Sequence, residues 1–351
     1  MKFGHFFLPT YFPEWDGDLG SYFRFLVDLA VASEELGFDS VWANEHHFDA
    51  YGGLVPSPPI LLAAVAQRTS AVRLGTSVVV LPLHNPIEVA EQLSMFDLMS
   101  GGRLEVGVGR GYVTSDYAAM GVPVAEGQER TLESLEILLR AWRNEPLSYE
   151  GRYYRFRDVD VWPKPEQQPP PIWMGCSRNP ASFEWTGTQG YRLMTIAHVN
   201  PLDELASLSS IYRRAWAGTG RDPDDCQVAT HFNALVDEDG DRARELAKLY
   251  LGRSMNLGLP TFPESNLAFH HAGAARLVDE GRVLAGSPEE CVTALERLQD
   301  QAGLTAVSCK FIFGGMPREL AERSMRLFAE GVIPRLKSRQ PEPLLSKRQT
   351  G

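Results

Sequence analysis

Three short stretches of the sequence contain side chains that can do chemistry. Glu45-His-His-Phe48 offers a carboxylate and two imidazoles, and Gly109-Arg-Gly-Tyr112 offers one cation between glycines. The segment 177–182 offers hydroxyls and a side-chain amide. Imidazole transfers protons near neutral pH, whereas arginine and the N-termini of helices bind phosphate. We therefore look for a phosphorylated ligand and a histidine that transfers protons.

The two histidines follow a predicted strand, 40–43, directly along the chain. Adjacent strand residues point to opposite faces, so His46 and His47 cannot both face one site if the strand stays regular. We therefore expect no metal site built on this pair. One inward histidine, with Glu45 beside it, could donate or accept a proton. The alternative is a histidine that hydrogen-bonds a neighbouring strand.

The glycine-rich stretch begins as a strand, because apolar residues alternate over 104–108. Glycine recurs at every second position from Gly107 to Gly111, which leaves bare backbone around the charge of Arg110. Such a strand end suits a phosphorylated cofactor, and the alternative is a tight turn with an arginine in water. The spacing is not the dinucleotide fingerprint, because Tyr112 stands at the third glycine position and we expect no helix to start there.

The segment 177–182 lies between a predicted strand and a helix that begins near Pro180. Ser177, Asn179 and Ser182 can present donors at this helix N-terminus, where a partial positive charge attracts phosphate. Ordinary helix capping by Ser177 or Asn179 would use the same donors. Because Arg110 ends the preceding strand and can lean toward the same place, the pattern favours a mononucleotide-sized cofactor.

Composition narrows the class of protein. The chain has 351 residues, 44% of them hydrophobic, and a net charge of −11, which argues against nucleic acid or an anionic membrane as a partner. The four cysteines have no paired spacing, so we expect neither disulfides nor a zinc site. This cysteine pattern fits a reducing compartment, and we expect the protein to be cytoplasmic. The apolar run at the start is too short for a signal peptide, and no run approaches membrane-spanning length.

Strands and helices alternate along the chain. Periodicity predicts strands at 2–9, 40–43, 73–81, 104–108, 172–176, 193–197, 228–236 and 306–313. It predicts helices at 20–36, 57–69, 86–99, 128–144, 179–189, 201–217, 240–257, 288–301 and 317–335. Eight alternations predict an α/β fold, the (β/α)8 TIM barrel. A doubly wound sheet is the alternative, but it would need a phosphate-binding glycine loop after the first strand.

We expect a single domain over 1–337, with insertions after the fourth and seventh helices of the barrel. The first insertion, 145–171, is proline-rich and predicts a short hairpin. The second, 258–286, is a candidate lid, and 338–351 is predicted to be a flexible tail.

In a barrel of this kind the working face lies at the C-terminal ends of the strands. That rule selects the residues already named and adds candidates for contact with a substrate, which are Phe6, Tyr11, His84 and His198. Their composition favours an apolar or aromatic small molecule.

Several stretches of the sequence match the motifs of a known family. These stretches are Glu34–Trp42, Glu45–Phe48, Gly75–Pro82, Gly109–Tyr112 and Gly286–Cys291. With them, the chain resembles the bacterial luciferase-like flavin monooxygenases over nearly its whole length, and is most similar to the luciferase α subunit and its homodimeric relatives.

The resemblance implies a two-component monooxygenase in which a separate flavin reductase supplies reduced FMN and O2 is the co-substrate. In this family a flavin C4a-(hydro)peroxide oxidises an organic molecule such as an aldehyde or ketone. It also implies a homodimer. The alternatives are an F420-dependent oxidoreductase of the same superfamily, a non-catalytic flavin-binding subunit and, more distantly, a metal hydrolase barrel.

The resemblance also assigns roles to residues. The catalytic histidine falls on His46 and the phosphate-binding arginine on Arg110, while a non-proline cis peptide at Ser77–Val78 would press against one flavin face. The remaining expected cofactor contacts are Glu45, Tyr112, Ser177, Arg178, Asn179 and Ser182. Where the luciferase α subunit has a reactive cysteine, this chain has Gly109, from which we expect open space beside the flavin ring.

Overall fold

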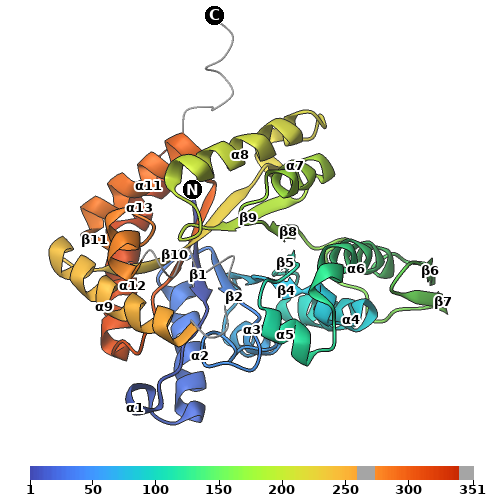
Figure 1. Cartoon of the computed structure of the whole chain (residues 1–351), viewed down its shortest axis with the longest axis horizontal. Helices are drawn as coiled ribbons and strands as arrows, with labels where there is room; N and C mark the ends of the chain where they lie inside the picture. Colours follow the sequence, from blue (N-terminus) through green and yellow to red (C-terminus); the bar gives the residue numbers. More distant parts are fainter. Residues whose placement is uncertain (259–272, 340–351) are drawn as a thin grey trace, which may run out of the picture.

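The computed structural model describes residues 1–258 and 273–339. Eight parallel strands form a closed barrel, with helices around it (Figure 1). The barrel strands are β1 (Lys2–Phe7), β2 (Ser40–Ala43), β3 (Arg73–Thr76), β5 (Leu104–Gly109), β8 (Ile172–Gly175), β9 (Arg192–Ile196), β10 (Val228–Val236) and β12 (Ala306–Lys310). The ring closes because β10 pairs with both β9 and β12. The predicted TIM barrel is confirmed.

Helices follow the strands and cover the outside of the barrel (Figure 1). The longer ones are α2 (Leu19–Glu35), α3 (Pro58–Ala66), α4 (Pro86–Ser100), α6 (Gly127–Ala141), α7 (Pro180–Gln189), α8 (Leu202–Ala217), α9 (Gly240–Gly258), α11 (Pro288–Ala302) and α12 (Arg318–Gly331). Short helices are α1 (Pro13–Asp16), α5 (Thr114–Ala119) and α13 (Ile333–Lys337). Within the described ranges, no helix combines the length and apolar character needed to span a membrane.

The apolar core lies in two layers, one between the barrel and the helices and one inside the barrel. Large apolar side chains fill the inner layer, where the rings of Trp42 and Trp173 meet edge to face at 5.5 Å. Below them, the carboxylate of Glu105 accepts hydrogen bonds from Arg73 (2.7 Å), Arg192 (3.0 Å) and the indole N–H of Trp173 (2.7 Å). Since these arginines begin β3 and β9, the network closes the N-terminal end of the barrel.

The first insertion forms the predicted hairpin, with β6 (Leu147–Glu150) antiparallel to β7 (Arg155–Val159). It projects from the right of the barrel in Figure 1. In the second insertion the part 259–272 lies outside the described residues. The rest includes a strand that the sequence did not predict, β11 (Leu284–Gly286), which pairs with the C-terminal part of β10.

Four further boundaries differ from the predictions. The long strand predicted at 73–81 is divided into β3 and β4 (Val79–Val80), with a cis peptide bond at Ser77–Val78 between them. A helix, α5, does begin shortly after Tyr112, contrary to expectation. The last strand ends at Lys310 rather than at residue 313. The final helix is divided before Pro334, which lacks the N–H that a continuous helix needs. The tail from 340 lies outside the described residues.

Gly107 offers a test of how tightly the barrel wall is packed. A Cβ atom at this position would lie 1.9 Å from the backbone oxygen of Thr76, so we expect Gly107→Ala to lower the free energy of unfolding by about 3 kcal/mol. Gly252→Ala in α9 is the matched control. Its Cβ meets nothing closer than 3.8 Å, and we expect a gain of up to about 1 kcal/mol. Urea unfolding of both variants checks this, and equal stabilities would contradict it.

Candidate active site

The end of β2 directs its side chains to alternate sides, as the sequence predicted. His46 faces Tyr112 at the C-terminal end of the barrel, whereas His47 and Glu45 meet on the outer side of the strand. The imidazole Nε2 of His46 lies 3.4 Å from the hydroxyl of Tyr112, and the two rings meet nearly at right angles. His46 is thus the imidazole of the pair that is placed at the working face.

A carboxylate lies on the other side of the His46 ring. Asp116 of α5 is buried, and its Oδ2 lies 3.9 Å from Nδ1 of His46. Its Oδ1 has no hydrogen-bond partner within the described part of the chain. Burial raises the pKa of the Tyr112 hydroxyl, which stays protonated and can donate. His46 therefore has a potential donor at one nitrogen and a negative charge near the other. Asp116 was not predicted as a site residue, because the sequence shows no helical pattern for the short helix that carries it.

The carboxylate of Glu45 holds together the outer side of this region. Its Oε1 lies 3.0 Å from Nε2 of His47 and 2.6 Å from Nε2 of His84, and its Oε2 accepts from the backbone N–H of Val80 at 3.0 Å. Burial by itself would raise the pKa of Glu45, but these hydrogen bonds lower it. Burial would likewise lower the pKa of His84, but Glu45 raises it.

This cluster differs from what the sequence suggested. Glu45 and His84 were expected at the cofactor and the substrate, and the structure places both in the outer cluster instead. His46 and His47 point to different sides, and Glu45, His47 and His84 bring three potential ligand atoms within 4.8 Å of one another. Both imidazoles already donate to the same carboxylate oxygen of Glu45, which accounts for the arrangement without an ion.

The cis peptide bond implied by the resemblance is present at Ser77–Val78. The Ser77 hydroxyl lies 2.7 Å from Nε2 of His231, inside the barrel. The Val78 side chain covers two neighbouring glycines, since a Cβ added at Gly109 or Gly175 would approach its methyl groups to 2.9 or 3.0 Å. The expected open space beside Gly109 is therefore wrong, because Val78 fills it.

Arg110 and the N-terminus of α7 follow neighbouring strands, since β5 pairs with β8. Arg110 is exposed, and the hydroxyl of Tyr117 donates to its carbonyl oxygen. Asn179 caps α7, with its Oδ1 accepting from the N–H of Ala181 at 3.1 Å. Arg178 donates to the carbonyl of Val199 at 2.8 Å. The capping alternative is thus realised at Asn179, and Arg110 and Arg178 bring exposed guanidinium groups to these two strand ends.

The other expected substrate contacts are spread out. Phe6 lies inside the barrel and stacks on His231 with ring centroids 4.2 Å apart. The hydroxyl of Tyr11 donates to the carbonyl of Gly17 at 2.6 Å. The carbonyl of His198, which follows β9, accepts from Arg282 at 3.4 Å. Phe6 is thus the one of the four that the structure places in the barrel interior.

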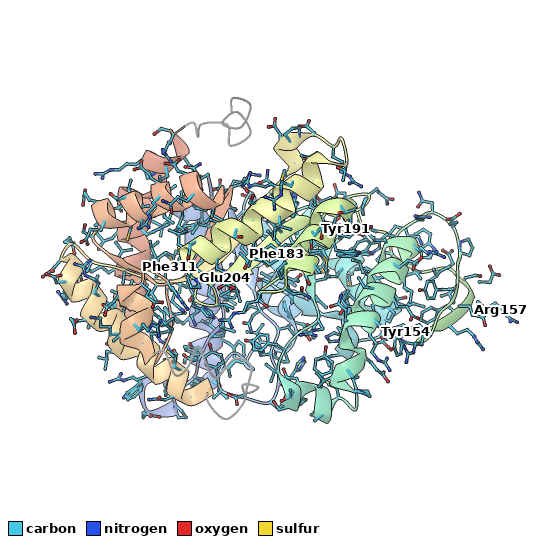
Figure 2. The ribbon with its side chains drawn as sticks, turned by 45° about the horizontal axis from the view of Figure 1, so that its top comes forward. Tyr154, Arg157, Phe183, Tyr191, Glu204 and Phe311 are labelled. Carbon is cyan, nitrogen blue, oxygen red and sulfur yellow. The ribbon has the colours of Figure 1, made fainter. Side chains whose placement is uncertain are left out.

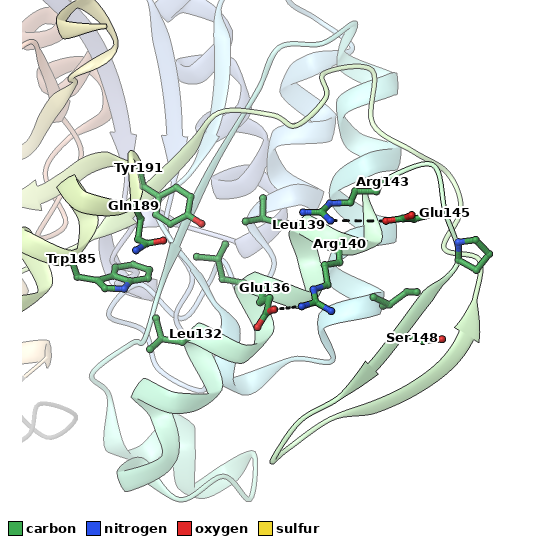
Figure 3. A pocket seen from close by; sticks show the side chains of 13 residues that line it. Leu132, Glu136, Leu139, Arg140, Arg143, Glu145, Ser148, Trp185, Gln189 and Tyr191 are labelled. Atoms are coloured by element: carbon green, nitrogen blue, oxygen red, sulfur yellow. Dashed lines mark hydrogen bonds and ion pairs between the residues drawn. The ribbon is translucent and has the colours of Figure 1, made fainter. Parts of the chain in front are cut away.

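A separate groove of about 530 Å³ lies outside the barrel, between α6, the hairpin and α7 (Figure 3). Trp185 and Tyr191 line one side, and the ion pairs Glu136–Arg140 and Arg143–Glu145 line the other. None of the predicted site residues lines it.

Comparison with known proteins decides the family. The model of the family described as luciferase-like monooxygenase matches residues 1–305. The chain belongs to this family. It is 27% identical to the alkanal monooxygenase alpha chain of Photorhabdus luminescens, covering 97% of this chain and 98% of that one. It is 29% identical to the 4-hydroxyprotoasukamycin monooxygenase of Streptomyces nodosus subsp. asukaensis, covering 88% of this chain and 85% of that one.

Solved structures agree with this membership. Monooxygenase RslO1 from Streptomyces bottropensis superposes with a TM-score of 0.87 at 32% identity, covering 96% of this chain and 100% of that one. Two structures at 21% identity share the fold. They are the oxygenating constituent of 3,6-diketocamphane monooxygenase from Pseudomonas putida in complex with FMN (TM-score 0.78, covering 98% and 100%) and an F420-dependent secondary alcohol dehydrogenase (TM-score 0.74, covering 95% and 98%). Luciferase-like family membership supports an oxidoreductase.

The Glu45–His84 pair makes stability depend on pH. The folded-state pKa of His84 is raised above its ordinary 6.5, so its contribution is complete below that pH and is lost as the pH rises through the folded-state value. We expect His84→Gln to lower the free energy of unfolding by about 2 kcal/mol at acidic pH and by progressively less at alkaline pH. Urea unfolding between about pH 5.5 and 9 measures this. In a Glu45→Gln background the pH dependence should vanish, and a pH-independent difference in the native background would contradict the expectation.

Proposed function

We propose that the protein is a monooxygenase that uses reduced FMN, supplied by a separate reductase, and O2 to oxidise a small apolar organic molecule such as an aldehyde or ketone. One observation carries the proposal most directly. His46 is held between Tyr112 and Asp116 at the end of the barrel where Arg110 and the N-terminus of α7 also lie. This combines a proton-transferring group with a place for an anion.

The residues of this region fit an FMN-sized group. Gly109 and Gly175 on adjacent strands leave room for the Val78 side chain, which forms an apolar surface over both. A flat ring can rest against such a surface, while the phosphate reaches the guanidinium of Arg110 and the N–H groups at the start of α7. Reduced flavin, when bound, supplies the electrons that activate O2.

The side chains around this place have distinct tasks. His46 holds or delivers a proton at Nε2, and the Tyr112 hydroxyl orients that nitrogen from 3.4 Å. Asp116, 3.9 Å from Nδ1, places a carboxylate beside the other ring nitrogen and can orient the ring. The packed aromatic residues below exclude water from the floor of the site.

The choice between FMN and F420 rests on the motifs and on the relatives. Related structures bind each cofactor on this fold. The Glu-His-His-Phe and Gly-Arg-Gly-Tyr motifs resemble those of FMN-dependent members, and the full-length relatives at 27–29% identity are named as monooxygenases. An F420-dependent oxidoreductase remains the second candidate.

We further propose that the protein forms a homodimer and works in the cytoplasm. The outer faces of α3 and α4 expose large apolar side chains, among them Ile60 (74% exposed), Met95 (53%) and Met99 (47%), which a second copy could cover. The four cysteines are free and buried, as suits a reducing compartment.

Removing the guanidinium of Arg110 tests how the cofactor is held. We expect Arg110→Ala to weaken FMN binding by about 10- to 100-fold, because a charge-assisted contact to phosphate is lost. Quenching of flavin fluorescence measures the affinity, and the same titration with F420 compares the two cofactors. Arg157→Ala is the matched control, since Arg157 lies at the far edge of the hairpin (Figure 2). Tighter binding of F420 than of FMN would favour an F420-dependent oxidoreductase. Equal FMN affinities of Arg110→Ala and Arg157→Ala would contradict a phosphate site at Arg110.

Replacing His46 tests the proton-transfer role. We expect His46→Gln to reduce turnover with photoreduced FMN and O2 by about 100-fold or more, because the general acid–base group is missing. The affinity for FMN should change little. Oxygen consumption, followed with aliphatic aldehydes and ketones as candidate substrates, measures the effect. Unchanged consumption in His46→Gln would exclude the histidine as the proton-transfer group.

A further inference from the structure

A lysine stands at the inner side of the barrel rim, where the sequence analysis named no residue. Lys310 is the last residue of β12, two positions after Ser308. The Ser308 hydroxyl points into the barrel, because a Cβ added to Gly4 on β1 would lie 2.4 Å from it. Alternation along the strand places Lys310 on the same side, one layer nearer the C-terminal end.

Lys310 is buried and has no anionic partner within the described part of the chain. Its exposed fraction is 3%, and its Nζ lies 5.5 Å from the centre of the Phe313 ring. Neither a hydrogen bond nor an ion pair to a described residue holds the amine. Burial lowers the pKa of Lys310 to about 7. A buried amine without a counter-charge opposes folding, so folding alone does not explain a lysine here.

A second polar group beside it also lacks a partner. Asn233 on β10 is the register neighbour of Lys310, and its exposed fraction is 5%. Its Oδ1 has no hydrogen-bond partner among the described residues. Two strands away from β12 on this side of the ring, His198 follows β9, so the rim here is polar over a floor made of Phe6 and His231.

We propose that Lys310 and Asn233 bind the ionised oxygen of the organic substrate, so that the substrate class is an apolar molecule carrying a carboxylate, enolate or phenolate. The proposal rests on the proposed function, because it concerns the substrate of the same barrel. An ammonium in this apolar position attracts an oxyanion strongly, and the Asn233 amide supplies the second hydrogen-bonding contact. The phosphate place at Arg110 lies at β5, apart from β12, which leaves β10 and β12 to the substrate.

The anion preference can be measured without cofactor. Isothermal titration of flavin-free protein at pH 7 compares decanoate with decan-1-ol, which share a chain length and differ in charge. We expect decanoate to bind at least about 10-fold more tightly, since a buried charge-assisted contact is formed. In Lys310→Met the preference should disappear while decan-1-ol binds as before. The matched control is Lys248→Met, because Lys248 is engaged with Glu245 and Asp279 at the surface.

A second variant keeps the lysine and tests the charge alone. Asn233→Asp places a carboxylate next to Lys310, so the internal ion pair should abolish the preference for decanoate as completely as Lys310→Met does. Titration with 4-nitrophenol separates the sources of the oxyanion, because the absorbance of the phenolate reports whether the site also ionises a phenol. Binding of decanoate without ionisation of the phenol assigns the site to carboxylates.

A spectroscopic readout guards against misfolded variants. The sequence has six lysines, so ¹³C-lysine NMR can resolve the Lys310 side chain in the unmodified protein. We expect one lysine to titrate near neutral pH and to shift to a higher pKa when decanoate is added. Three results would each overturn the proposal. They are equal affinities for decanoate and decan-1-ol, a preference for decanoate that persists in Lys310→Met, and a Lys310 resonance whose pKa does not change when decanoate is added. The FMN titrations of Arg110→Ala test the cofactor site independently. A negative result with decanoate therefore would not contradict the proposed FMN-dependent function.

Discussion

One buried carboxylate fixes the geometry on which the candidate site depends. Glu45 receives hydrogen bonds from His47 two residues along the chain, from the backbone of Val80 and from His84. These donors come from the segment that follows β2, from β4 and from the turn that leads into α4, so three segments are fastened at one point. With its two neighbours fixed on the outer side, His46 has to face inward. The orientation of His46 is thus set by the hydrogen bonds of the residues on either side of it.

The neighbouring wall, built by β5 and β8, follows from a different constraint, the absence of side chains. Gly107, Gly109 and Gly175 have other atoms where a Cβ would stand, either the Thr76 carbonyl or the Val78 methyl groups. The Thr76 carbonyl and the Val78 side chain thus occupy space that these glycines leave open. Strand backbone, an apolar methyl surface and an exposed guanidinium succeed one another along this wall. Such a surface suits a ligand with a flat apolar part and an anionic end.

The sequence predicted the barrel well because its strands and helices are long enough to show their period. The opposite orientation of His46 and His47 needed only strand alternation. Asp116 was missed, since a helix of six residues is too short to show a helical pattern. The contact of Glu45 with His84 was missed because it joins residues 39 positions apart. Lys310 was overlooked because the apolar residues 311–313 continued the strand pattern, so the lysine did not stand at a predicted strand end.

The hydrogen bonds of Glu105 at the N-terminal end of the barrel bear on how ligands enter and leave. Its two arginines and the indole of Trp173 meet at the N-terminal end of the barrel, and aromatic side chains pack above them. We therefore expect a ligand that enters at the C-terminal rim to leave by the same rim. If two molecules that lie one above the other in the barrel enter and leave by a single opening, the one that entered last leaves first.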